Sequence, residues 1–280
     1  MTPLETLQAI DAPTVSIVVL AAVSSALVVS TPVRGRRDHQ RFLAELAAAA
    51  TPDAQEVVRT RHYRRWTLDG WGSAALAVLL VAVLPGVGLA DLGLRAPDLA
   101  ALLEARVGSV GAARVAGVLT GAVLAVVGSA VVLRLLARRS TTPVVAGAGA
   151  IEPMLPRTGR GRRGWAWLAL AAGVTEEVTY RGLLLLTLGL LAPTAGRTAV
   201  LVTAAVLFGV AHWYQGRLGM LATGVIGWVL GDLYLATGSL LVPMVVHTLV
   251  DLRALLLPVS DARPARPTPA RGPVDALVAS

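Results

Sequence analysis

Apolar residues occur along this chain in long runs, separated by short segments that carry most of the charged residues. Seven of these runs are close to the ~20 residues that a helix needs to cross a hydrocarbon core of ~30 Å. The runs cover residues 13–33, 70–90, 112–135, 164–191, 196–214, 218–237 and 239–257. The pattern predicts an all-α fold, a polytopic transmembrane helix bundle of about seven spans.

The same pattern gives the domain organisation. We expect residues 1–258 to form a single membrane domain. Residues 259–280 are rich in proline and arginine and show no apolar periodicity, which predicts a disordered tail. The connection 34–66 mixes arginines with apolar residues, and we expect it to be helical and to lie on the inner face of the membrane.

The arginine distribution predicts the orientation. All 25 basic residues are arginines and the net charge is +8. They gather between the apolar runs, as the positive-inside rule requires, which argues against a nucleic-acid partner. The connections 34–66 and 134–163 hold eight and seven arginines. We therefore expect these connections and the C-terminus to be cytoplasmic and the N-terminus to be outside, in a multi-pass protein of the cell membrane.

Several ionisable residues interrupt the later apolar runs, although each such residue costs ~3 kcal/mol at the centre of a span. The candidates for a site in runs four, five and seven are Glu176, Glu177, Arg181, His212, His247 and Asp251. Counting at ~1.5 Å per residue from the ends of their runs places Glu176 and His247 at the same depth, with His212 nearby. The sequence therefore predicts a buried polar site among spans four, five and seven.

Helical spacing indicates how these residues relate to one another. Glu177 and Arg181 are four residues apart and share a face, so they can pair. That pairing leaves Glu176 without a charged partner on its own helix, which suits a general base. His247 and Asp251 are also four apart, so the carboxylate can orient the imidazole or join it in binding a metal. A single residue of this kind is as often structural as functional, but the set at one depth favours a site.

Three short motifs carry a family resemblance. "EEVTYR" (Glu176 to Arg181) matches EExxxR, "FGVAH" (Phe208 to His212) matches FxxxH, and "HTLVD" (His247 to Asp251) matches HxxxN/D. Their order and spacing resemble the CPBP family, also called the Abi or CAAX-protease-like family. It includes the Ras-converting type of CAAX prenyl endopeptidase and proteins linked to bacteriocin processing and immunity. The resemblance covers about residues 160–258, which it implies are the catalytic core.

The resemblance implies roles for the site residues. Glu176 matches the glutamate that activates water, and Glu177 and Arg181 match a supporting pair. His212 matches a histidine that holds or activates the water. His247 and Asp251 match a pair that stabilises the oxyanion. This chain has aspartate where better-known members have asparagine, and an ionised aspartate has no hydrogen to donate to an oxyanion.

The expected function is therefore that of an intramembrane endopeptidase acting on a membrane protein or peptide in the lipid bilayer. The family's use of metal is disputed, so the expected cofactor is either none or zinc. If a metal is used, its ligands would be His212, His247 and Glu176. Two other interpretations remain open, a non-proteolytic membrane scaffold or immunity protein of the same fold and an ion or proton transporter. The sequence does not indicate the oligomeric state.

Overall fold

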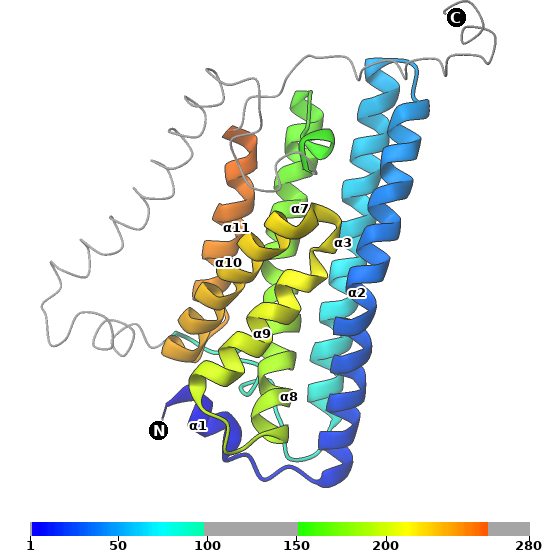
Figure 1. The fold of residues 1–280 in the computed structure, drawn as a ribbon. Helices are drawn as coiled ribbons and strands as arrows, with labels where there is room; N and C mark the ends of the chain where they lie inside the picture. Colours follow the sequence, from blue (N-terminus) through cyan, green and yellow to red (C-terminus); the bar gives the residue numbers. More distant parts are fainter. Residues whose placement is uncertain (1, 98–150, 257–280) are drawn as a thin grey trace, which may run out of the picture.

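The computed structural model describes residues 2–97 and 151–256, and every regular element in these two ranges is helical. Two long antiparallel helices stand beside a bundle built from the second half of the chain (Figure 1). The α-helices are α1 (Pro3–Gln8), α2 (Thr14–Ala48), α3 (Pro52–Val83), α7 (Gly159–Glu177), α8 (Leu184–Leu191), α9 (Arg197–Ala211), α10 (Gly216–Thr237) and α11 (Leu241–Leu252). Short 3-10 turns occupy Glu152–Met154, Trp213–Gln215 and Arg253–Leu256.

The helices fall on six of the seven predicted apolar runs, and the remaining run, 112–135, lies outside the described residues. In the described ranges, three helical segments are long and apolar enough to cross a membrane: Thr14–Ala48, Pro52–Val83 and Trp213–Thr237. The shorter apolar helix Arg197–Ala211 lies below that length. The all-helical fold is confirmed, whereas the count of seven spans stays a prediction. The predicted tail, 259–280, also lies outside the described residues.

The connection 34–66 is helical, as expected, and its place on the inner face of the membrane stays a prediction. It forms the end of the α2–α3 hairpin, because α2 continues unbroken from the apolar run to Ala48. Its 35 residues span about 52 Å at 1.5 Å per residue, well beyond a ~30 Å hydrocarbon core. The two arms are held together by stacking of Phe42 on His62, with ring centroids 4.5 Å apart, and by an Arg65–Asp38 contact at 3.7 Å.

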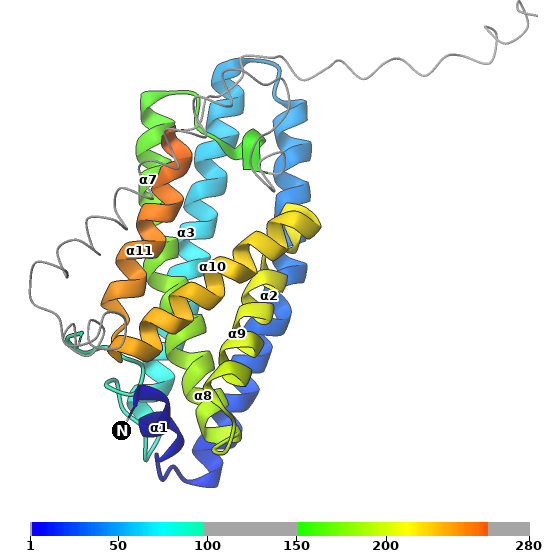
Figure 2. The same ribbon diagram turned by 60° about the vertical axis from the view of Figure 1, so that its left-hand side comes forward.

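One nearly continuous helix, from Gly159 to Leu191, runs through the bundle and carries the EEVTYR motif. Its first part, α7, packs between α3 and α11 (Figures 1 and 2). Residues Val178–Leu183 then form a π-helical turn before α8 continues. Every residue of that turn is buried, and Leu183, Leu185 and Leu186 lie fully inside the main apolar core.

Helices α9 and α10 form a close antiparallel pair, and α10 crosses the bundle obliquely towards α11 (Figure 2). The pair approaches closely at Gly209, where a Cβ atom would lie 2.6 Å from the backbone oxygen of Met220. An ion pair of 2.7 Å between Arg197 and Asp232 joins the same two helices. This packing fixes the end of α9, which carries His212.

The segment after α3 returns to the bundle and contacts the turn between α10 and α11. Gly93 accepts a hydrogen bond from the Leu240 backbone at 2.9 Å, and the Arg95 side chain donates to the Gly238 carbonyl at 2.7 Å. Gly238 ends α10 with φ of 64°, a left-handed conformation that glycine adopts without strain. The start of α11 is thereby fixed to the first half of the chain.

A polar cluster around the buried Glu56 and Arg59 fixes the start of α7 to α3. Glu56 accepts hydrogen bonds from the Thr158 hydroxyl at 2.9 Å, the Arg157 backbone at 3.3 Å and the Arg59 guanidinium at 3.2 Å. Arg59 also donates to the Pro153 carbonyl at 2.9 Å. We call Glu56, Arg59, Arg157 and Thr158 the α3–α7 clamp. Sequence reasoning did not find it, because its members lie about 100 residues apart.

Candidate active site

The two adjacent glutamates end α7 and face different surroundings. The side chain of Glu177 is 0% exposed, whereas that of Glu176 is 32% exposed and lines a cavity. Successive helical residues point about 100° apart. Glu177 therefore lies on a buried face of α7, whereas Glu176 lies on the neighbouring face, which borders the cavity. The π-helical turn begins directly after them. Such turns are rare and are frequent at functional sites.

Glu177 stands at the centre of a buried ionic cluster. Its Oε1 accepts from Arg181 Nη1 at 2.7 Å and contacts His247 Nδ1, also at 2.7 Å. Arg181 donates with its other terminal nitrogen to the Gly227 carbonyl at 2.9 Å and lies 4.3 Å from the centre of the Phe208 ring. The arginine compensates the charge of Glu177 in a low-dielectric environment. Glu177 thus links the arginine to the histidine of α11.

Close packing of α7 against α11 makes this contact possible. At Gly173, one turn before Glu176, a Cβ atom would lie 2.2 Å from the Thr248 hydroxyl and 2.8 Å from the Thr248 backbone nitrogen. No side chain fits there without displacing α11. Glycine at this position therefore lets Glu176 and Glu177 reach His247.

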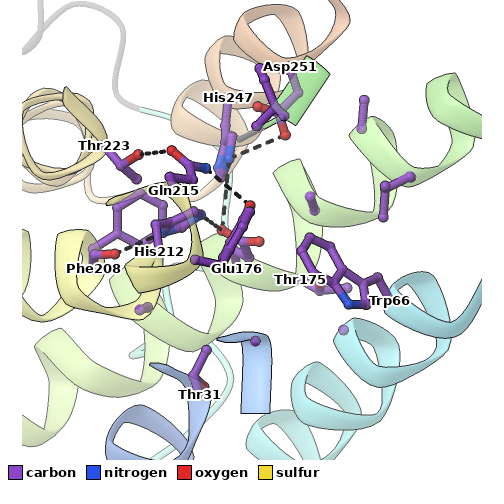
Figure 3. Close-up of a pocket in the computed structure, with 18 of the residues that line it drawn as sticks. Thr31, Trp66, Thr175, Glu176, Phe208, His212, Gln215, Thr223, His247 and Asp251 are labelled. Carbon is purple, nitrogen blue, oxygen red and sulfur yellow. Dashed lines mark hydrogen bonds and ion pairs between the residues drawn. The ribbon is translucent and has the colours of Figure 1, made fainter. Parts of the chain in front are cut away.

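Three polar atoms from three helices converge beside the cavity (Figure 3). Glu176 Oε2 lies 3.8 Å from His212 Nε2 and 4.0 Å from His247 Nε2. This oxygen is shielded from solvent and has no hydrogen-bond partner among the described residues. Buried polar atoms are usually paired, so an unpaired carboxylate oxygen between two imidazoles marks a place for a further polar atom.

The orientation of both imidazoles is fixed by the hydrogen bonds of their Nδ1 atoms, on the side of the ring away from Glu176. His212 Nδ1 lies 2.9 Å from the Phe208 carbonyl oxygen, which can only accept, so Nδ1 carries the hydrogen and donates. The Phe208 ring packs against the His212 ring, with centroids 4.9 Å apart. His247 Nδ1 donates to Glu177 in the same way. Both histidines therefore direct Nε2 at Glu176.

Asp251 approaches the same nitrogen of His247 from the other side. Its Oδ2 lies 3.7 Å from His247 Nε2, beyond a hydrogen bond, and its side chain is 34% exposed. The Asp251 backbone carbonyl accepts from the Trp165 indole at 3.2 Å, which ties α11 to α7. The carboxylate that orients His247 is thus Glu177, seventy positions away, while Asp251 faces the cavity.

The cavity has a volume of about 370 Å³. Its walls include Glu176, His212, His247 and Asp251, together with residues of the α2–α3 hairpin such as Asp69. A volume of this size lies within the range of ligand pockets. All of the catalytic residues implied by the resemblance either line this cavity or, for Glu177 and Arg181, support a residue that does.

Comparison with known proteins identifies this part of the chain. Residues 163–253 match the family model described as type II CAAX prenyl endopeptidase Rce1-like. This region is similar to the CAAX protease family. Searches of curated proteins and of solved structures found no match.

The match covers the three helices that carry the site, from α7 to α11, and we call residues 163–253 the CAAX-protease region. The family is one of proteases, and with the apolar helices it indicates a membrane protein. The family also implies a membrane-associated peptide as substrate and a bilayer as environment. The predicted family is thereby confirmed.

The distances between Glu176, His212 and His247 can be compared with those of the ligands in a zinc site. Two imidazoles and one glutamate are ligands that catalytic zinc sites use. In a tetrahedral site with bonds of ~2.0–2.1 Å, two ligand atoms lie about 3.4 Å apart. The separations here are 3.8 and 4.0 Å, and no group of three His, Cys, Asp or Glu in the described ranges is placed to hold a metal ion. These two separations are about 0.5 Å longer than zinc ligands require, and they suit a water at ~2.8 Å from Glu176 Oε2 and from an imidazole nitrogen.

Sequence reasoning missed several features of this site. The π-helical turn has no signature in "VTYRGL", because no single residue type specifies it. The contact of Glu177 with His247 could not be predicted from spacing, since the two residues lie on different helices. Tyr214, Gln215 and Thr223 also line the cavity. The only signal for Tyr214 and Gln215 is their position just after the FxxxH motif, where "WYQG" follows His212 directly.

Proposed function

We propose that this protein is an intramembrane endopeptidase that hydrolyses a peptide bond of a membrane-associated protein or peptide, with Glu176 activating the water. One observation carries the proposal. The solvent-shielded Oε2 of Glu176 lacks a hydrogen-bond partner among the described residues and lies about 4 Å from two imidazole nitrogens at the wall of a cavity. A water in that position would be held by all three groups.

Glu176 acts as the base and then as the acid. It takes a proton from the water as the water oxygen attacks the carbonyl carbon of the scissile bond, and the carbonyl oxygen gains a negative charge. When the tetrahedral intermediate collapses, the C–N bond breaks and Glu176 gives the proton to the departing nitrogen. Proton transfer by a positioned side chain contributes ~10²–10⁴-fold to the rate. Every step uses groups of this chain and one water.

The two histidines position the water. With Nδ1 bound to the Phe208 carbonyl, neutral His212 offers a lone pair at Nε2 and accepts one hydrogen of the water. The other hydrogen goes to Glu176, and a water has no third. For His247 to contribute, its Nε2 must therefore carry a hydrogen and donate it to the water or to the carbonyl oxygen. We assign a second proton to His247, which lies within 4.0 Å of Glu176, Glu177 and Asp251.

Membrane proteomics tests the activity even though the substrate is unidentified. Cells that produce the wild type are compared with cells that produce Glu176→Gln, and new protein ends are sought in the membrane fractions. We expect a set of cleaved membrane proteins that is lost in Glu176→Gln and kept in Glu45→Gln, a matched change on the hairpin surface where Glu45 contacts Arg61 at 3.7 Å. Identical ends in all three samples would contradict proteolysis and favour the scaffold. Ion flux in liposomes that depends on Glu176, without cleavage, would favour the transporter.

The orientation in the membrane is part of the proposal. The hairpin end, around residue 53, lies at the opposite end of the molecule from the α8–α9 turn around residue 194 (Figure 1). Because the hairpin holds many arginines, we assign its end to the cytoplasm and the α8–α9 turn to the outside. The chain has no cysteine, so Asp53→Cys and Thr194→Cys each give one label site. An impermeant maleimide should label only Thr194→Cys in intact cells, and the reverse result would invert the topology.

A further inference from the structure

Tyr214 lies at the wall of the cavity that contains Glu176, and its ring is fixed by three other rings. Its centroid lies 5.9 Å from that of His212, 5.2 Å from that of Trp66 and 5.3 Å from that of His39. Trp66 and His39 belong to the two arms of the hairpin, so Tyr214 connects the CAAX-protease region to the hairpin. The three motifs of the family resemblance do not include it.

A directed chain of hydrogen bonds leads to the Tyr214 hydroxyl. The Thr223 hydroxyl donates to Gln215 Oε1 at 3.2 Å, a contact drawn in Figure 3, and Gln215 Nε2 donates to the Tyr214 oxygen at 3.1 Å. An amide oxygen only accepts and an amide nitrogen only donates, so the direction of the chain is fixed. The tyrosine oxygen is therefore an acceptor from Gln215, and its own hydrogen is free to point elsewhere.

The hydrogen of the Tyr214 hydroxyl is free to point towards the cavity that Tyr214 lines. Among the described residues, no hydrogen-bond acceptor is found for it, and Tyr214 lines the same cavity as Glu176 and Asp251. A hydroxyl donor held by Gln215 on the wall of the cavity that also contains the proposed base has the properties of an oxyanion-hole donor. Such donors act because they are aimed in advance at the charge that develops in the transition state.

We infer that Tyr214 is a catalytic residue that donates a hydrogen bond to the carbonyl oxygen of the scissile peptide bond as that oxygen becomes an oxyanion. The inference rests on the proposed function. It adds a donor to the site, because a carboxylate at position 251 has no hydrogen to donate when it is ionised, whereas asparagine in its place would have one. In this chain the donor comes instead from the segment after the FxxxH motif. The tyrosine keeps its proton throughout, so the proton balance of Glu176 is unchanged.

The first test is Tyr214→Phe in the full-length protein reconstituted in phosphatidylcholine and phosphatidylglycerol liposomes. The probe is a pool of internally quenched peptides, with and without an S-prenyl cysteine. The substitution removes one oxygen and keeps the ring packing. We expect kcat to fall ~10²–10³-fold, the usual loss for one oxyanion donor, with KM and the melting temperature unchanged. Tyr234→Phe is the matched control, since its hydroxyl faces the Asp91 carbonyl at 3.4 Å, and it should keep wild-type kcat.

Inhibition by a transition-state analogue distinguishes a catalytic role of Tyr214 from a role in packing. A trifluoromethyl ketone built on the cleaved peptide hydrates to a tetrahedral form that resembles the intermediate. Its inhibition constant should rise in Tyr214→Phe by about the factor by which kcat/KM falls, because both report binding of the tetrahedral oxygen. A residue that only supports packing would not weaken the tetrahedral inhibitor while leaving KM unchanged.

A double-mutant cycle tests the direction of the hydrogen-bond chain. In Gln215→Glu the carboxylate can only accept, so Tyr214 would turn its hydrogen towards residue 215 and away from the substrate. Gln215→Glu should lower kcat strongly in the wild type and much less in Tyr214→Phe, with any effect of the new charge cancelling in the cycle. Full cleavage by Tyr214→Phe, or additive losses in the cycle, would overturn the assignment to Tyr214 alone. No cleavage of any probe by the wild type would overturn the proposed function and this assignment together.

Discussion

Two buried glutamates of this protein, Glu56 and Glu177, each form an ion pair with an arginine three or four positions later. They differ in how many of their carboxylate oxygens accept a hydrogen bond. In the α3–α7 clamp, Oε1 of Glu56 accepts one hydrogen bond and Oε2 accepts two. In the CAAX-protease region, Glu177 uses Oε1 for both of its partners, and Oε2 has none among the described residues. The neighbouring Glu176 has an unpaired oxygen as well.

The difference indicates which cluster is built for stability and which for chemistry. A fully satisfied polar network rigidifies a fold, whereas a partly satisfied one costs free energy and persists for a reason. The clamp closes the start of α7 against α3 and has no unpaired carboxylate oxygen in the described ranges. The cluster around Glu177 lies beside the cavity and holds a histidine towards it. Four substitutions test this contrast, from the largest expected effect to the smallest.

Arg181→Met should have the largest effect on stability. It leaves the buried charge of Glu177 with His247 as its remaining partner, and breaking a buried ion pair typically costs about 3–5 kcal/mol. The free energy of unfolding, measured by denaturation in mixed detergent micelles, should fall by that amount. Glu177→Gln/Arg181→Met removes both charges and should regain most of the stability without regaining cleavage. A single Arg181→Met variant as stable as the wild type would show that Glu177 does not need Arg181 as its ion-pair partner.

Glu56→Gln should weaken the clamp alone. In glutamine only one of the two terminal atoms is an acceptor, so the hydrogen bonds to either Oε1 or Oε2 of Glu56 are lost. Hydrogen bonds to charged groups are worth ~1.5–3 kcal/mol each. We expect a loss of that size in the free energy of unfolding, with unchanged cleavage per folded molecule at a temperature where the variant is folded. If cleavage by the folded variant fell as much as stability, the clamp would belong to the catalytic machinery and the contrast would fail.

Gly173→Ala should separate the helices that form the site. The new Cβ atom would meet the Thr248 hydroxyl at 2.2 Å, and overpacking of this kind costs ~1–3 kcal/mol. Because the displaced helix carries His247, cleavage should fall as well. Gly72→Ala is the matched control, since nothing lies within 4 Å of its Cβ position, and it should keep both cleavage and stability. Equal behaviour of the two variants would show that α7 and α11 can adjust freely.

Asp251→Asn should have the smallest effect. Asparagine adds a donor at the cavity wall and removes one carboxylate near His247, so we expect cleavage to stay the same or to rise up to ~10-fold. Elemental analysis of the purified protein accompanies the rate. Stoichiometric zinc together with a ~10–100-fold slower Asp251→Asn variant would support a metal ligand shell and contradict the water site.

The helical fold could be predicted from the sequence because long apolar runs leave few alternatives in a bilayer. The run 164–191 is one helix in the structure, broken only by a π-helical turn. The hairpin could not be predicted, because the charged part of 34–66 resembles a surface helix and only contacts such as Phe42 with His62 show how the arms pair.

The candidate site could be predicted in part, because helical spacing places residues on a face but does not say what that face meets. The spacing of Glu177 and Arg181 predicts a pair, and the two side chains lie 2.7 Å apart. The same rule applied to His247 and Asp251 gives a contact of 3.7 Å, while the shorter contact of His247 is to Glu177 on another helix. Tyr214 was missed for the same reason. The catalytic roles themselves stay predictions.

The central claim is that Glu176 is the base and that its unpaired oxygen serves chemistry instead of stability. The most direct test measures cleavage and unfolding of Glu176→Gln in one preparation of the full-length protein. We predict that cleavage falls on the order of 10²–10⁴-fold, while the free energy of unfolding stays the same or rises, because the substitution removes a shielded, unpaired carboxylate oxygen. Full cleavage by Glu176→Gln, or a loss of cleavage explained by unfolding, would contradict the account.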